Sequence, residues 1–119
     1  MAEFKHRRLE VWLIARVMVK KIYEISSRFP STEAFGLTGQ IRRAAISVPS
    51  NIAEGSSRQT KADFIHFLVM ARGSLAEVDT QLTLAEDLGY VVEQANLHSF
   101  IEDLSIRLNH LIAHIRGGG

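Results

Sequence analysis

One spacing pattern constrains this chain more than any other feature: apolar residues recur at alternating steps of four and three along separate segments. The clearest stripe contains Phe64, Leu68, Ala71, Leu75, Val78, Leu82 and Ala85. Such steps place side chains on one face of an α-helix, and no segment shows the period of two that is typical of a half-buried strand. The pattern therefore predicts an all-α protein.

Three further segments repeat this pattern, and the expected helices cover residues 7–28, 38–55, 61–88 and 93–116. Residues that commonly start or stop helices lie near these boundaries: Pro30, Thr38 as an N-cap, Thr60 with Asp63, and Gly89. Four long helices with short connections predict an antiparallel up-down-up-down four-helix bundle. A length of 119 residues favours one domain, spanning 1–119.

The second expected helix has the most unusual local sequence, FGLTGQIRRAAISVPSNIAEGSSR over residues 35–58. Pro49 interrupts its apolar stripe without ending it. Proline has no N–H to bond the carbonyl of Ala45, and its ring crowds that carbonyl. We therefore expect a kink in the middle of this helix.

A short polar motif follows the proline and consists of Ser50, Asn51, Glu54 and Gly55. Its simplest interpretation is structural: polar side chains satisfy the carbonyls freed by Pro49, and the glycine permits a tight helix end. Glu54 can also pair with Arg58, four residues later. The alternative is a polar network between subunits, or a surface for a partner.

Composition sets the broad class of protein. The chain is 46% apolar and has no cysteine, so it can fill a core but forms no disulfide or thiolate metal site. No run approaches the ~18 apolar residues of a membrane span, and MAEFKHRRLE has no apolar segment typical of a signal peptide. We expect a soluble cytoplasmic protein that does not enter a membrane.

The net charge of +1 hides an asymmetry between the two halves. Residues 1–61 contain 11 Lys or Arg against 5 Asp or Glu, a balance of +6, whereas residues 62–119 contain 3 against 8, a balance of −5. The candidate nucleic-acid contacts in the basic half are Arg16, Lys20, Lys21, Arg28, Arg42, Arg43, Arg58 and Lys61. No aromatic residues are interleaved with these cations in a way that suggests base stacking, so we expect phosphate-dominated binding.

Arg42 and Arg43 have a second interpretation. Guanidinium groups suit phosphate oxygens, but they also suit carboxylates. The alternative to phosphate contact is therefore a structural ion pair with an acid of the third or fourth helix, such as Asp79, Glu86 or Asp103.

Catalytic and metal sites are not expected. The chain has no Gly-rich phosphate loop, GxSxG motif or cysteine nucleophile. His110 and His114 share a helix face but have no evident third ligand, and His6, His66 and His98 are isolated, so packed or solvated histidines are the better interpretation. We expect a non-enzyme without metal or cofactor.

The block over residues 35–58, followed by DFIHFLVMARGSLAEVDTQLTLAEDLGY, resembles the four-helix-bundle proteins encoded in intervening sequences of bacterial 23S rRNA genes. These proteins are related to the accessory variability determinants of diversity-generating retroelements. The resemblance is most specific over residues 40–55 and 73–90. It implies a homo-oligomer, typically a ring of five, with a basic surface for nucleic acid and no established enzymatic activity.

These observations lead to two hypotheses for the function of the protein. The first is an oligomeric module that binds RNA or DNA through its basic half. The second is a protein-interaction scaffold, for example an accessory partner of a reverse transcriptase, a role that the resemblance implies. The broad apolar faces of the third and fourth helices favour self-association, although scattered surface apolar residues are also normal.

Overall fold

The computed structural model describes residues 4–117, so residues 1–3 and 118–119 of the expected 1–119 domain lie outside the described residues. Four long helices and two short 3-10 turns make up the fold: η1 (Lys5–Arg8), α1 (Glu10–Ser26), η2 (Ser31–Glu33), α2 (Leu37–Ser56), α3 (Lys61–Asp87) and α4 (Ala95–Arg116). Residues 4–117 contain no strand. The predicted all-α class with four long helices is confirmed.

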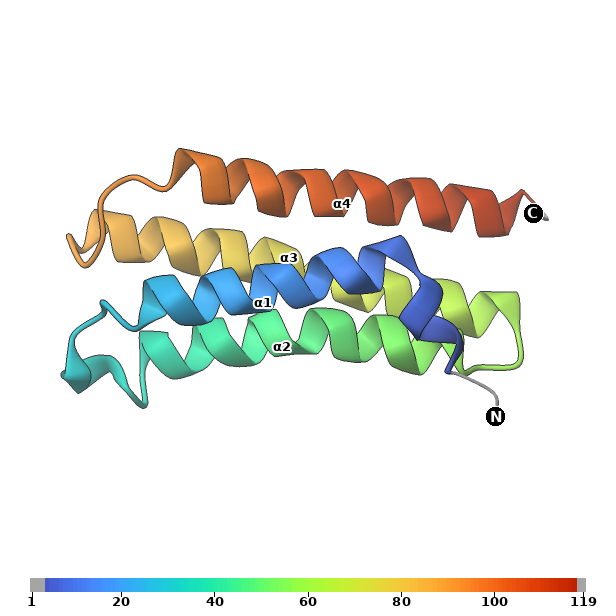
Figure 1. The fold of residues 1–119 in the computed structure, drawn as a ribbon, viewed down its shortest axis with the longest axis horizontal. Helices are drawn as coiled ribbons and strands as arrows, with labels where there is room; N and C mark the ends of the chain where they lie inside the picture. Colours follow the sequence, from blue (N-terminus) through green and yellow to red (C-terminus); the bar gives the residue numbers. More distant parts are fainter. Residues whose placement is uncertain (1–3, 118–119) are drawn as a thin grey trace.

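The four helices lie alongside one another in an elongated molecule of 46 × 28 × 19 Å. Figure 1 shows the chain turning back at each of the three connections between long helices, with both ends of the chain at the same end of the molecule. The contact between α2 and α3 is the most extensive, and that between α1 and α4 the least. None of the helices described has the length and apolarity needed to cross a membrane.

The core consists of the predicted stripes. The buried positions on α1 and just after it are Val11, Ala15, Met18, Ile22, Ile25, Ser26 and Phe29, and those on α3 are Leu68, Ala71, Ser74, Leu75, Val78, Leu82 and Ala85. Full burial of one such aliphatic side chain contributes about 1.5–3 kcal/mol. On α4 the buried stripe includes Ile112, whereas its neighbour Leu111 is only half-buried.

The helix starts differ from the sequence prediction. The first helix begins at Glu10 rather than at residue 7, because Leu9 is extended and separates it from η1. Thr38 is not the N-cap of α2: Gly36 holds that position, and the Glu33 carboxylate accepts a hydrogen bond from the Leu37 backbone N–H at 3.0 Å. A side chain from the preceding turn thus caps α2.

The ends of α3 agree with the prediction. The Thr60 hydroxyl accepts a hydrogen bond from the Asp63 backbone N–H at 3.1 Å, as an N-cap does. Gly89 follows the helix with φ of +76°, a conformation that favours glycine.

Candidate nucleic-acid interface

The predicted basic side chains of α1 face in different directions. Arg16 lies over the indole of Trp12 at 5.1 Å from the ring centroid, and Arg7 lies over the same ring at 5.7 Å. Lys20 is exposed one turn after Arg16. Lys21 instead faces α4, where it lies 5.2 Å from the centroid of the Phe100 ring.

Lys21 also lines a hollow between α1 and α4. This hollow has a volume of about 410 Å³, and its walls include Arg28 of the segment after α1, Glu24 of α1, and Phe100 of α4. The weak contact between α1 and α4 leaves room for it. Two predicted cations therefore meet here around an aromatic ring and one carboxylate.

Arg42 does not form the ion pair with an acid of α3 or α4 that was the alternative to phosphate contact. Its Nε donates to the Ser26 hydroxyl at 2.8 Å, its Nη2 donates to the Tyr23 carbonyl at 3.3 Å, and its guanidinium lies 4.4 Å from the Tyr23 ring centroid. The acids expected as alternative partners bond elsewhere: Asp79 and Glu86 with His98, and Asp103 with Arg107. Arg42 thus ties α2 to the C-terminal end of α1.

Arg43, the neighbouring residue, is exposed and forms no hydrogen bond or ion pair with any residue from 4 to 117. A guanidinium carries five N–H donors, and all five of this group remain available. The ion pair considered for Arg43 is therefore not formed within the described chain, and this side chain is the better placed of the two for phosphate.

Arg58 and Lys61 lie at the turn between α2 and α3. Arg58 forms the predicted ion pair with Glu54 at 3.0 Å and lies 4.7 Å from the Phe67 ring centroid. Lys61 begins α3 and is exposed. Figure 1 shows this turn at the opposite end of the molecule from the C-terminal end of α1, so the predicted cations are spread along its length.

Aromatic rings therefore accompany several of the predicted cations, an arrangement that the sequence analysis did not include. A cation over a ring gains about 0.5–1 kcal/mol at exposed sites. The four-residue spacing of Trp12 and Arg16 is visible in the sequence. In contrast, Arg42 and Tyr23 lie 19 residues apart, and no local spacing signals their contact. The rings therefore restrict where these cationic side chains can lie.

The polar motif after Pro49 was predicted to satisfy the backbone carbonyls that the proline frees, and this explains it only in part. Helix α2 continues through Pro49, and the Asn51 amide donates to the Ser47 carbonyl at 2.9 Å rather than to that of Ala45. Gly55 lies inside the helix with no positive φ, so its role is not a tight helix end. A Cβ at Gly55 would lie 2.8 Å from the Phe67 Cβ, so this glycine permits the close approach of α2 to α3.

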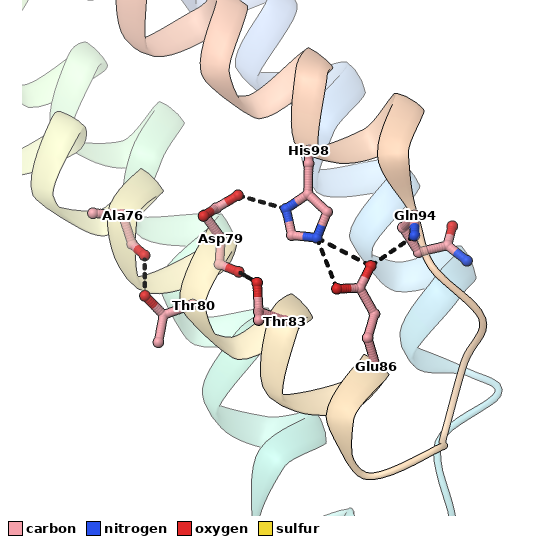
Figure 2. Close-up of polar contacts among 7 residues, drawn as sticks. All are labelled: Ala76, Asp79, Thr80, Thr83, Glu86, Gln94 and His98. Carbon is pink, nitrogen blue, oxygen red and sulfur yellow. Dashed lines mark hydrogen bonds and ion pairs between the residues drawn. The ribbon is translucent and has the colours of Figure 1, made fainter.

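His98 forms a polar cluster that the sequence reasoning missed by treating it as isolated. Figure 2 shows its ring, carried by α4, between two carboxylates of α3. Nδ1 lies 2.6 Å from Asp79 Oδ1, and Nε2 lies 3.0 Å from Glu86 Oε1. Glu86 also accepts a hydrogen bond from the Gln94 backbone N–H at 2.6 Å, at the start of α4.

The carboxylates favour the charged form of His98. Burial alone would lower its pKa, but the hydrogen bonds to Asp79 and Glu86 and their negative charges outweigh burial, so the pKa of His98 is raised. Burial alone would raise the pKa of Glu86, but the bonds from Gln94 and His98 lower it overall. The cluster joins α3 to α4, and it becomes an ion pair when His98 is protonated.

No group of three potential metal ligands gathers anywhere in residues 4–117. His98 is bonded to two carboxylates, and His6 packs 4.7 Å from Trp12 between ring centroids. His110 and His114 are both exposed on α4. These positions suit packing, ion pairing and solvation.

The sequence was compared with known proteins. A family model described as 23S rRNA-intervening sequence protein matches residues 7–110. No curated protein gives a significant match. The matched range contains α1, α2 and α3 in full, most of α4, and all eight predicted basic residues. The chain belongs to the 23S rRNA-intervening sequence protein family.

Proposed function

We propose that the protein is a non-enzymatic, cytoplasmic homo-oligomer that binds nucleic acid, RNA in preference to DNA, through phosphate contacts. The observation that carries this proposal is the set of cations on aromatic rings, together with the unpaired Arg43. A ring that restricts a cationic side chain reduces the conformational entropy lost when that side chain binds phosphate. The name of the family also points to ribosomal RNA.

The proposal includes an antiparallel up-down-up-down bundle with a bend at Pro49, assembled into a ring of five. Supporting the assembly, large apolar side chains remain exposed on all four long helices, including Leu13 on α1, Ile46 on α2, Leu84 on α3 and Ile106 on α4. The basic balance of residues 1–61 and the acidic balance of residues 62–119 also allow the two halves of neighbouring copies to attract each other. Symmetry would multiply the basic surface.

Binding across a salt series tests the phosphate mechanism. We expect the affinity for a structured RNA to fall steeply with salt, since each phosphate contact adds roughly 0.7–0.9 to the slope of log K against log salt. Arg43→Ala should reduce that slope by about 1 for each bound arginine. Light scattering after size exclusion gives the oligomeric state in the same samples.

Arg107→Ala is the matched control because its guanidinium is already bonded to Glu10 and Asp103. This variant should keep the wild-type slope. Arg42→Ala should instead lower the thermal midpoint, since it removes bonds to Ser26 and Tyr23. The absence of RNA and DNA binding at low salt, or an affinity that does not respond to salt, would overturn the proposal.

A protein-interaction scaffold is the second candidate, with a reverse transcriptase as one possible partner. It is favoured by Leu84, Leu88 and Val92, which are 45%, 58% and 78% exposed near the end of α3. Leu84 and Leu88 lie one turn apart on the same helix face. A pull-down with Leu84→Glu as the comparison tests this surface, and a monomeric wild-type chain that captures no partner would refute the scaffold.

A further inference from the structure

A second hollow, with a volume of about 640 Å³, lies where the N-terminal segment meets the C-terminal half of α2. It is separate from the hollow between α1 and α4. Three kinds of group surround it: aromatic rings, hydrogen-bond acceptors and a cation. Its lining residues include Phe4, His6, Phe67, Ser50, Asn51 and Glu54. Ser50, Asn51 and Glu54 of the motif after Pro49 therefore meet in one site. Satisfying the carbonyls freed by Pro49 did not explain their exposed polar atoms.

The aromatic side of this hollow offers a stacking surface. The rings of Phe4 and His6 are stacked, with centroids 5.5 Å apart and an interplanar angle of 27°. Phe4 is 71% exposed, so the core does not need its side chain. Flat exposed rings of this kind stack on nucleobases, because every base has a π-face.

The polar side of the hollow offers acceptors. The Asn51 amide N–H₂ donates to the Ser47 carbonyl, and the amide oxygen has no partner among the described residues. Glu54 uses Oε1 for Arg58, and within residues 4–117 neither its Oε2 nor the Ser50 hydroxyl has a partner. A ligand that fits these groups must present neighbouring N–H donors. Among the common bases only guanine has two adjacent donors, N1–H and N2–H, on its Watson–Crick edge.

The charges around the hollow identify the rest of the ligand. Lys5 lines it, and Arg58 stands beside it over the Phe67 ring, against the single carboxylate of Glu54. This balance disfavours a cationic ligand such as an arginine side chain of a protein partner. It favours an anionic backbone, since lysine and arginine bind phosphate.

We propose that this hollow binds an unpaired guanine nucleotide of single-stranded RNA. The base stacks on the free face of Phe4, whose other face is covered by His6, and its N1–H and N2–H donate to Glu54 and Asn51. Its phosphate lies at Lys5. The inference rests on the proposed nucleic-acid binding and deepens it, because it adds a base preference to contacts that otherwise ignore sequence.

Short labelled RNAs and fluorescence anisotropy test the proposal. The probes are hexauridine and three variants in which one central uridine is replaced by guanosine, inosine or adenosine. We expect the guanosine strand to bind about tenfold more tightly than the adenosine strand, a difference typical of one well-placed bidentate contact. The inosine strand should bind more weakly than the guanosine strand because inosine has no N2 amino group.

Glu54→Gln should abolish most of the guanosine preference without lowering the affinity for hexauridine. Glu77→Gln is the matched control: Glu77 is exposed on α3 and has no partner within residues 4–117, so this variant should keep the preference. Phe4→Ala should weaken binding of all three purine-containing strands. Circular dichroism melts confirm that each variant is folded.

The outcomes separate this inference from the proposed function. Equal affinity for all four strands, with a steep salt dependence, would refute the guanine site and leave phosphate binding intact. A guanosine preference that survives Glu54→Gln would place the base elsewhere and also refute the site. No binding of any strand at low salt would overturn both.

Discussion

The close contact between α2 and α3 at Gly55 gives the sharpest test of the structure, because Gly73 on α3 provides an internal control. Gly73 lies in the middle of α3 and Gly55 one residue before the end of α2, so alanine gains up to about 1 kcal/mol of helix propensity at either position. A Cβ at Gly55 would lie 2.8 Å from the Phe67 Cβ and 3.2 Å from the Phe64 carbonyl oxygen. A Cβ at Gly73 would meet no atom within 4 Å.

The difference between the two variants therefore isolates the cost of overpacking. The atoms that crowd the new methyl at Gly55 belong to the stem of Phe67 and to backbone, so one helix must move. Overpacking of this kind costs about 1–3 kcal/mol. We expect Gly73→Ala to stabilise the fold by about 1 kcal/mol and Gly55→Ala to destabilise it by about 1 kcal/mol.

Urea unfolding and thermal melts followed by circular dichroism measure both changes. At about 4 °C per kcal/mol, the two midpoints should differ by roughly 8 °C. Protein concentration must be equal in all samples, and light scattering must show the same oligomeric state, because association raises the midpoint. If Gly55→Ala proved as stable as Gly73→Ala, the close packing of α2 on α3 would be wrong.

Two other contacts give predictions with a pH or titration readout. Because the folded-state pKa of His98 is raised, its pairing with Asp79 and Glu86 contributes fully below the unfolded pKa of about 6.5 and is lost as pH rises through the folded value. The wild-type unfolding free energy should therefore fall as the pH rises above about 6.5, and His98→Gln should lack this decline; parallel pH profiles would contradict the cluster. The Tyr90 hydroxyl donates to Glu33 at 2.6 Å and lowers the pKa of that carboxyl. Tyr90→Phe should raise the Glu33 pKa in an NMR titration and lower the thermal midpoint, whereas an unchanged pKa would show that the bond does not form in solution.

Several local features could be predicted from the sequence because they depend on neighbours within one or two helical turns. The apolar stripes of α1 and α3 are buried as their spacing predicts. Two of these features join residues no more than four positions apart: the Thr60 cap and the Glu54–Arg58 pair. The third, the helix stop at Gly89, depends on the backbone of that one residue. The bend at Pro49 and the ring of five remain predictions.

The sequence was a poor guide where a side chain from a neighbouring element took the role that a local pattern assigns to another residue. Thr38 has a good N-cap side chain, yet Glu33 caps α2 because η2 brings its carboxylate to the Leu37 N–H. Gly55 has the composition of a helix end, but its missing side chain serves the contact with Phe67. Neither choice is visible without the neighbouring segment in place.

The sequence by itself determined the all-α class, the four helices and most of the core, because helical periodicity and burial are encoded in residue spacing. Tertiary structure alone decided the partners of the charged residues that bond from one helix to another. Arg42 bonds to Ser26 and Tyr23 rather than to an acid, and His98 lies between two carboxylates of another helix. Charge attraction acts through space, so its partners are known only when the helices are packed together.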